Sequence, residues 1–372
     1  MPPNCQSITM FQAVFLLFSQ LALFCSAQPK LAADCTDGLL VVGGKTSAGP
    51  TARIDLAIRG PNWCQNSGFP DLPEPLVSPG AYFSNDYLLV CGFSGNSSCK
   101  ATKRGWSSWH DVPSMDTEEH FKMAFLVAQG GASVNMLSKE TEAARGNDNH
   151  LQSLSFSSGE PQWKEMTGNS SPFNLDYRDF ENACFGSFGF GKFIIAGGYK
   201  TEPCWRCNNY GSSARVGIWN QDGSTCCGAA PTFEDGVIPD MREARETHAC
   251  SEFGQSFVVS GGYYYHYGAS QGGSSTIFEP KVSAEYFDGT TWIGMANMSH
   301  ARSNFGLNTM CGALYAFGGV QMEDRATDSK FLSSVEVIWS LSDEWSELMG
   351  SNQIPEAKGY FASIPVTGME CW

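Results

Sequence analysis

The feature of this sequence that most limits its fold is a short apolar pattern that ends at a glycine pair or its equivalent and recurs along the chain. The copies are Leu39–Gly44, Leu88–Phe93, Phe193–Gly198, Phe257–Gly262 and Leu314–Gly319, with Ser133–Ser138 as a degenerate copy in the long gap. Their last positions are 49, 45, 60, 64 and 57 residues apart. A repeat of this period indicates one supersecondary unit used six times.

Each unit continues in the same way after its glycines. A variable loop, an alternating strand and a turn lead to a tryptophan, most clearly in Ser283–Trp292 and Ser333–Trp345. The earlier units carry Trp63, Trp109 and Trp163, while the fourth has Cys226 at the matching place. Another strand precedes each glycine strand. The sequence therefore predicts four antiparallel strands per unit.

This pattern resembles the kelch repeat, in which a strand ending in Gly-Gly is followed by a spaced aromatic residue and a Trp. The resemblance covers essentially the whole mature chain and implies an all-β fold, a six-bladed β-propeller of four-stranded antiparallel blades. Paired glycines allow unusual backbone angles and close approach of a neighbouring backbone. One four-stranded sheet cannot bury both of its faces alone, whereas six around an axis bury them and protect their edges.

The two ends of the repeated region are expected to share one blade. Leu39–Gly44 lacks an innermost partner, and Gly359–Val366 is an innermost-type strand without a successor. The C-terminal strand should therefore complete the first blade and close the ring. Across this seam we predict a Cys35–Cys371 disulfide, and we predict a local Cys91–Cys99 bridge. The other eight cysteines of the mature chain allow 105 connectivities and are not paired from the sequence.

The N-terminus is typical of a secretory signal peptide. An apolar run, Met10–Phe24, is followed by small residues, which predicts cleavage after Ala27. We therefore expect residues 1–27 to be a signal peptide and residues 28–372 to form one propeller domain, secreted and without a membrane span. Cleavage leaves twelve cysteines, an even number that favours disulfides in an oxidising compartment. Three N-x-S sequons predict N-glycosylation at Asn96, Asn169 and Asn297.

The formal net charge of −15 limits the classes of partner. Such an acidic chain is a poor match for the phosphate backbone of nucleic acid or for an anionic membrane surface. We therefore expect an extracellular protein or glycan as partner and no nucleic acid. The same charge is also common in soluble exported proteins without any acidic role.

Length variation between the units predicts where a binding surface lies. The connections between the second and third strands emerge on the same face of each blade as the links to the next blade. The long connections are Lys139–Asn149, Tyr199–Ala214, Tyr263–Lys281 and Val320–Lys330. Insertions gathered on one face of a repeat protein mark its binding surface.

An aromatic tract should open one of these loops and is our main candidate binding site. It consists of Tyr263, Tyr264, Tyr265, His266 and Tyr267. Tyrosine offers a broad apolar ring with one polar tip, which suits contacts with protein or carbohydrate. Alternatively, the rings simply pack over the edge of the blade.

Three cations occupy matching places ahead of innermost strands, namely Arg245, Arg302 and Lys358. One hypothesis is a ring of positive charge near the mouth of the central channel, available for binding. The alternative is that these residues are surface charges in salt bridges.

Some enzymes also have a propeller fold, but this sequence contains few of the residues that their active sites need. Copper radical oxidases resemble kelch propellers and need two histidines and two tyrosines; Tyr265-His266 echoes one adjacent pair, but no second set of ligands can be placed. The C-x-x-C of Cys204 and Cys207 lacks both a thioredoxin-like context and a second C-x-x-C for zinc. Sialidase-like repeats are disfavoured, and a sugar mutarotase-like propeller is a further alternative. We assign no catalytic residue and no cofactor, and the leading hypothesis is a binding module.

Overall fold

The computed structural model describes most of the chain after residue 34. The described ranges are 35–84, 86–93, 98–112, 124–129, 133–139, 149–155, 162–165, 183–188, 192–201, 210–212, 216–220, 232–235, 238–270, 273–321 and 330–371. The predicted signal peptide, Asn96, Asn169, Cys204, Cys207 and Cys226 lie outside these ranges. Within them, the structure contains no helix with the length and apolarity that a membrane crossing needs.

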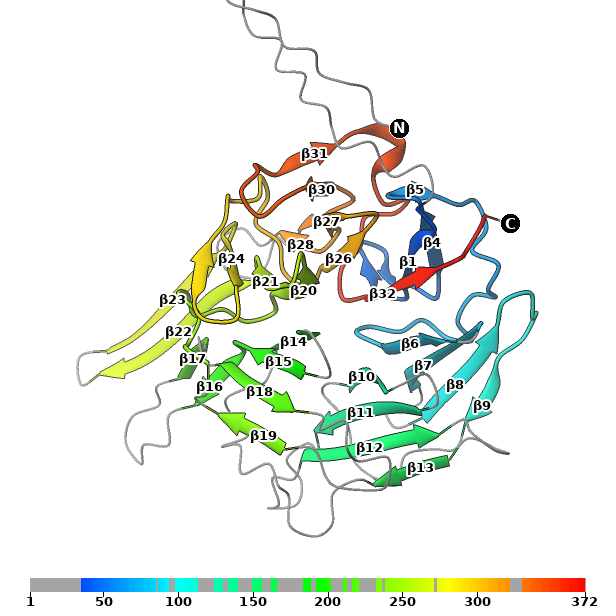
Figure 1. The fold of residues 1–372 in the computed structure, drawn as a ribbon, viewed down its shortest axis with the longest axis horizontal. Helices are drawn as coiled ribbons and strands as arrows, with labels where there is room; N and C mark the ends of the chain where they lie inside the picture. The colour runs from blue at the N-terminus through cyan, green and yellow to red at the C-terminus, as the bar shows by residue number, and fades with distance from the viewer. Residues whose placement is uncertain are drawn as a thin grey trace, which may run out of the picture.

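Six four-stranded antiparallel sheets surround a central axis, as Figure 1 shows. They are written here from the innermost strand outward. Blade 1 consists of β32 (Ala362–Thr367), β1 (Asp37–Val42), β4 (Ile54–Ile58) and β5 (Asn62–Trp63). Blade 2 consists of β6 (Gly80–Ser84), β7 (Tyr87–Phe93), β8 (Ser98–Lys103) and β9 (His110–Val112). Blade 3 consists of β10 (Ala124–Gln129), β11 (Ser133–Lys139), β12 (Asn149–Ser155) and β13 (Gln162–Glu165).

The second half of the ring repeats this arrangement. Blade 4 consists of β14 (Cys184–Ser187), β15 (Lys192–Ala196), β18 (Val216–Asn220) and β19 (Thr232–Asp235). Blade 5 consists of β20 (Ala249–Phe253), β21 (Ser256–Ser260), β24 (Ala284–Phe287) and β25 (Trp292–Gly294). Blade 6 consists of β26 (Gly306–Met310), β27 (Ala313–Phe317), β30 (Val335–Ile338) and β31 (Ser346–Leu348). The predicted all-β fold of six four-stranded blades is confirmed.

The C-terminal strand closes the ring, as predicted. β32 pairs with β1 along its whole length, from Asp37 opposite Thr367 to Val42 opposite Ala362. β32 also contacts the innermost strands of blades 2 and 6, β6 and β26. Blade 1 is therefore built from both ends of the chain.

The core lies between adjacent blades, and strand β1 shows why its sequence is apolar without interruption. Leu40 and Val42 pack toward blade 2, in a cluster that includes Val90. Leu39 and Val41 pack toward blade 6, in a cluster with residues such as Tyr315. Since both faces of the strand are buried, every residue from 39 to 42 is apolar.

The glycine pairs end the second strand of a blade where the backbone of a link segment crosses. Gly44 has a φ of +104°, and a Cβ there would lie 2.7 Å from the carbonyl oxygen of Gly359. Gly262 has a φ of +79°, and a Cβ there would lie 2.4 Å from the carbonyl oxygen of Glu246. Side chains at these positions would displace the neighbouring backbone. The interpretation of the glycines as structural is confirmed.

The predicted Cys35–Cys371 disulfide is wrong, although both cysteines lie at the seam. Cys35 is bonded to Cys311, with a Cα–Cα distance of 5.5 Å. Cys371 is bonded to Cys64, with a Cα–Cα distance of 5.3 Å. The start of β1 reaches the β26–β27 turn of blade 6, while the tail beyond β32 runs outward to the residue that follows β5. The two ends of the seam therefore diverge.

Two further bridges lie away from the seam. Cys91 and Cys99 are bonded across strands β7 and β8, which confirms the predicted local bridge. Cys184 and Cys250 are bonded across the innermost strands of blades 4 and 5. This second bridge was not predicted, because it joins two different repeats.

The seam bridges should stabilise the fold more than the local one does. Cys35→Ala/Cys311→Ala opens a loop with a sequence separation of 276 residues, and Cys91→Ala/Cys99→Ala opens one of 8. A chain-entropy model gives losses of about 5 and about 2.5 kcal/mol. Guanidinium denaturation without reductant measures both, and peptide mapping checks the pairing. Equal losses from the two variants would contradict this expectation.

Candidate functional site

In the part of the chain that the structure describes, four hairpins extend from the connections between the second and third strands of the blades. They are β2 (Lys45–Thr46) with β3 (Gly49–Pro50), β16 (Tyr199–Thr201) with β17 (Tyr210–Ser212), β22 (Tyr263–Ser270) with β23 (Gly273–Pro280), and β28 (Val320–Gln321) with β29 (Lys330–Phe331). They belong to blades 1, 4, 5 and 6 in that order. We call the side of the ring that carries them the loop face.

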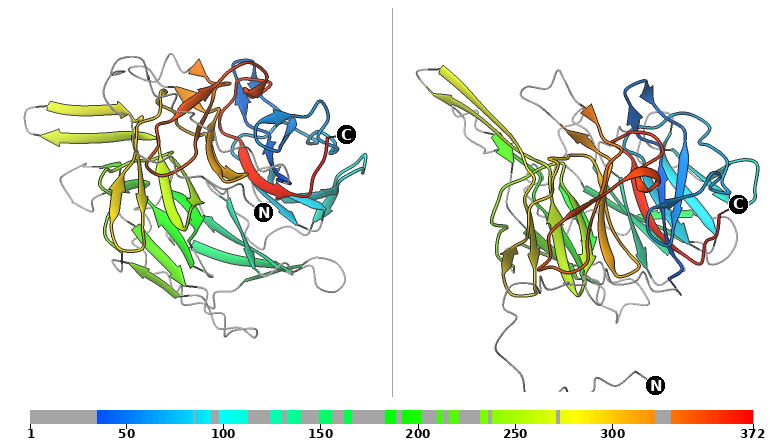
Figure 2. Two further views of the ribbon diagram at one scale, coloured as in Figure 1. Left: turned by 45° about the horizontal axis from the view of Figure 1, so that its top comes forward. Right: turned by 90° about the horizontal axis from the view of Figure 1, so that it is seen from above.

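The hairpins of blades 4 and 5 join into one additional sheet. Its strand order is β16-β17-β22-β23, and the joint is the pairing of Tyr210 with Tyr267 and of Gly211 with His266. In Figures 1 and 2, β22 and β23 extend well beyond the ring. We call these four strands the projecting sheet. No other described part of the molecule extends as far from the blades in these views.

The aromatic tract lies on a strand and not in an irregular loop, which corrects the sequence-based expectation. Residues Tyr263–Tyr267 begin strand β22, which pairs with β23 from Tyr263 opposite Pro280 to Ser270 opposite Gly273. Tyrosines favour a pleated strand, and Gln271-Gly272 lies between the two strands. These two signals together would have predicted the hairpin.

One face of β22 turns toward the ring. The ring of Tyr263 lies 4.9 Å from that of Phe278, and burial, reinforced by the charges of Glu246 and Tyr360, raises the pKa of Tyr263. Main-chain hydrogen bonds of 3.0 and 3.1 Å between Glu246 and Tyr263 hold the base of the hairpin. Tyr263 therefore anchors the hairpin and is half-buried.

The other face of β22 presents a more open group of side chains. The rings of Tyr264 and His266 are stacked, with centroids 6.4 Å apart and planes 6° apart. Lys281 Nζ lies 5.8 Å from the centroid of Tyr264. Ile277, directly opposite His266 on β23, is 41% exposed. We call Tyr264, His266, Ile277 and Lys281 the Tyr264 surface.

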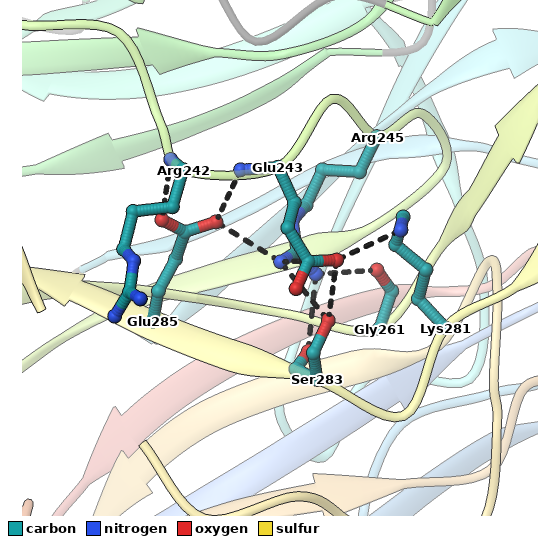
Figure 3. Close-up of polar contacts among 7 residues, drawn as sticks. All are labelled: Arg242, Glu243, Arg245, Gly261, Lys281, Ser283 and Glu285. Atoms are coloured by element: carbon teal, nitrogen blue, oxygen red, sulfur yellow. Dashed lines mark hydrogen bonds and ion pairs between the residues drawn. The ribbon is translucent and has the colours of Figure 1, made fainter. Parts of the chain in front are cut away.

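Arg245 is not on the surface, so it cannot contribute to a ring of exposed cations. Its side chain is fully buried under blade 5. Nη1 donates to the carbonyl oxygens of Gly261 (2.9 Å) and Ser283 (3.0 Å). Nη2 lies 3.0 Å from Glu285 Oε1, as Figure 3 shows. Burial lowers the pKa of Arg245, and the charge of Glu285 opposes that shift.

The other end of the Glu285 carboxylate fixes the link segment that carries Arg245. Its Oε2 accepts a hydrogen bond from the main-chain N–H of Arg242 at 2.8 Å. Glu243 accepts from Ser283 Oγ (3.0 Å) and lies 2.8 Å from Lys281 Nζ. Partial burial raises the pKa of Glu243, but these contacts and the charge of Arg245 hold it below its ordinary value. Arg245, Glu243 and Glu285 therefore join the link segment to strand β24 and to the base of the hairpin (Figure 3).

Blade 6 repeats the arginine–glutamate part of this arrangement. Arg302 Nη1 donates to the carbonyl oxygens of Gly318 (2.9 Å) and Ser334 (3.1 Å). Its Nη2 lies 2.6 Å from Glu336 Oε1, and both side chains are fully buried. Glu336 Oε2 accepts from the N–H of Ser299 at 2.6 Å. Arg302 is therefore a structural residue of the repeat, and its predicted exposure is wrong.

Blade 1 carries a shorter version, which links the two ends of the chain. Lys358 Nζ lies 2.6 Å from Asp55 Oδ2, and both side chains are buried. In blade 2 the matching places hold Leu76 and Lys100, so neither a buried cation nor a buried carboxylate is present. A cation ahead of the innermost strand and a carboxylate on the third strand thus occur together or not at all in blades 1, 2, 5 and 6. That co-occurrence was the available sequence signal for a buried pair.

Removal of one partner of a buried pair should destabilise the protein strongly. Arg302→Met leaves the Glu336 carboxylate buried without its counter-charge, which costs about 3–5 kcal/mol. Arg302→Met/Glu336→Gln should recover part of that loss. As a control, Lys281→Ala removes a partly exposed ion pair and should cost about 1 kcal/mol or less. Chemical denaturation followed by Trp fluorescence measures all three; a negligible effect of Arg302→Met would contradict the interpretation.

A row of main-chain hydrogen bonds connects the links of blades 5, 6, 1 and 2 on the loop face, and the sequence did not reveal it. It involves the residue two places after each buried cation, and the equivalent residue of blade 2. The N–H of Asn304 donates to Thr247 O (2.9 Å), that of Tyr360 to Asn304 O (2.9 Å), and that of Ser78 to Tyr360 O (2.6 Å). All four residues have φ values between +49° and +58°. Such left-handed angles are unfavourable for side chains like that of Thr247, so the surrounding contacts must hold them.

The next position along the link fills the space under the glycine pair of the preceding blade. Phe305 lies under Gly261, Phe361 under Gly318, and His248 under Gly197. His248 is buried, and that burial, together with the charge of Arg245, holds its pKa well below its ordinary value of 6.5. His248 is thus a neutral packing residue in a place that phenylalanine occupies elsewhere.

His248 should make stability sensitive to acid. Below pH 6.5 the unfolded chain binds a proton at this residue that the folded chain does not bind, so the free energy of unfolding falls as the pH falls. Between pH 7 and pH 5 the loss due to His248 is at most about 2 kcal/mol. His248→Phe should lose correspondingly less stability over this range in urea denaturation. Identical losses in the two proteins would contradict the assignment.

The residues considered for copper do not converge. Tyr265 and His266 are neighbours on β22, so their side chains leave opposite faces of the projecting sheet. Among described residues, the potential metal-ligand group is Cys35, Asp37 and Cys311. Both of its sulfurs are in one disulfide and provide no thiolate. Neither group has the ligand set of a radical-oxidase centre.

Comparison with known proteins agrees with this geometry. The kelch motif family matches residues 301–351, which cover blade 6 from Arg302 onward. The solved structure of YjhT is similar over 83% of this chain and 97% of that chain, with a TM-score of 0.51 and 12% sequence identity. A comparison with curated protein sequences found no match. The chain therefore carries a kelch motif in blade 6 and has the fold of a kelch-type β-propeller. This fold serves interaction proteins and enzymes alike, so function must be argued from the site.

Proposed function

We propose that the protein is a secreted binding module that recognises an extracellular protein or glycan through its loop face. The observation that carries this proposal is the projecting sheet. Two hairpins from different blades form a common sheet outside the ring, although the six blades already pack around the axis without it. A structure of this size beyond the core of the fold is best explained by recognition.

The Tyr264 surface has the chemistry that recognition requires. Stacked Tyr264 and His266 offer flat apolar faces with polar edges, and Lys281 adds a cation beside them. Ile277 supplies exposed aliphatic area on the same face. Aromatic residues are enriched at protein interfaces, and rings of this kind also stack on sugars. Binding by this preformed surface needs no bond-making step.

Secretion is supported by several independent features. Residues 1–27 have the pattern of a signal peptide, which leaves residues 28–372 as the mature domain. Four disulfides join parts of the described chain, as in proteins of oxidising compartments. Asn297 is exposed within its sequon and is accessible for glycosylation, and Asn96 and Asn169 remain predicted acceptors.

Substitution of the stacked pair tests the proposal. Tyr264→Ala/His266→Ala should reduce binding at least tenfold, because it removes both rings without touching the anchor Tyr263. The probes are a glycan array and a panel of purified extracellular domains, each presented to the wild type and the variant. Tyr286→Phe, on strand β24 of the ring, is the control. Full binding by the double variant to a wild-type partner would contradict the proposal.

A further inference from the structure

The outer edge of the projecting sheet is an unpaired strand. β23 is the last strand in the order β16-β17-β22-β23, and among the described residues it pairs with β22 alone. It is 8 residues long, which corresponds to about 27 Å of edge. In Figure 2 this edge extends away from the ring. A strand in this position has main-chain groups available to another strand.

The main-chain groups on that edge can be identified from the register. Ser270 and Gly273 are the last pair of the two strands and are separated by two residues, which makes them a hydrogen-bonded pair. Bonded and non-bonded pairs alternate from there. Two observations agree with this phase. The N–H of Lys281 donates to Gly262 O at 2.9 Å, and Tyr263 exchanges its bonds with Glu246 and not with Pro280. The N–H and C=O groups of Ser274, Thr276 and Phe278 thus point outward.

The position of the strand's proline fits the same assignment. Pro280 lies opposite Tyr263, in a pair where an N–H would point outward, so its missing donor removes no bond to β22. The devices that normally block an edge are absent from the segment before it. Residues 273–278, GSSTIF, contain no charge, no proline and no interruption of the pairing with β22.

We infer that this edge binds an extended peptide segment of a partner protein, which adds as a fifth strand beside β23. The inference rests on the proposed function and narrows its partner to a protein. Main-chain bonds to residues 274, 276 and 278 provide affinity, and side chains on the Tyr264 surface provide selectivity. The added strand continues the surface that carries Tyr264, His266 and Ile277.

The side chains of β23 define the chemistry of the partner segment. Ile277 is 41% exposed, and the residue opposite it on an added strand should be apolar. Glu279 lies on the same face two residues later and is exposed, so its opposite residue should be basic. In an antiparallel addition, the partner therefore reads basic-x-apolar from its N- to its C-terminal side.

A second copy of this chain is a poorer occupant. Each copy carries a net charge of −15, so two copies repel. Pairing of one short strand from each copy would also bury much less surface than the about 1,600 Å² of a standard protein interface. An extended basic segment is not repelled by the acidic chain. A small buried area is also sufficient for a peptide, because only a few of its residues become ordered.

A proline substitution on the outward side tests the edge directly. Thr276→Pro removes an outward N–H but no bond to β22, while Thr276→Ala changes the side chain and keeps the N–H. The probe is a set of ten-residue synthetic peptides with a central Lys-x-Val. Peptides that bind the wild type should bind Thr276→Pro at least tenfold more weakly and Thr276→Ala within about twofold. N-methylation of the peptide at alternate residues should abolish binding in one phase and spare it in the other.

The outcomes separate this inference from the proposed function. Loss of binding in Tyr264→Ala/His266→Ala with unchanged binding in Thr276→Pro would retain the surface and overturn strand addition. Absence of any peptide that prefers the wild type over Thr276→Pro would also overturn it. Sedimentation velocity of the wild type and Thr276→Pro shows whether a second copy takes the edge. A dimer that only the wild type forms would replace the peptide as occupant and overturn the inference.

Discussion

The pairing of β32 with β1 is the constraint on which the rest of the structure depends. Blade 1 buries one apolar face against blade 2 and the other against blade 6, so an open ring would leave such faces exposed. The six backbone pairs of this junction, the Lys358–Asp55 ion pair and two disulfides all hold residues that are far apart in sequence. Closure is thus reinforced by three kinds of interaction at one place.

The link segments transmit that order to the loop face. In blades 5 and 6 a buried guanidinium joins the link to the glycine-pair carbonyl and to a carboxylate on the third strand. The main-chain hydrogen bonds among Thr247, Asn304, Tyr360 and Ser78 then connect one link to the next. The hairpins start directly beside these links, as the bonds between Glu246 and Tyr263 show. The projecting sheet therefore stands on a rigid base, which is what recognition by a preformed surface requires.

Local sequence patterns predicted the strands and blades better than they predicted which distant residues contact each other. Glycine pairs, alternating strands and tryptophans were sufficient for the blades and their closure, because each depends on short-range backbone preference and on burial. The predicted pairing of Cys35 with Cys371 was wrong because the two cysteines bond to different blades, Cys35 to blade 6 and Cys371 to blade 1. The cations ahead of the innermost strands were read as exposed because a lone Arg is usually found on a surface. Their carboxylate partners lie 34 to 40 residues away in sequence in blades 5 and 6.

By itself, the sequence determined that the chain forms a closed ring of six small sheets, and it located the aromatic tract as the unusual element of that ring. Only the tertiary structure decided which tyrosines anchor and which are presented. That difference arises because alternate residues of a strand face opposite sides, and the ring lies on one side alone. The joining of hairpins from blades 4 and 5 was likewise beyond the sequence, since two neighbouring blades bring them together in space.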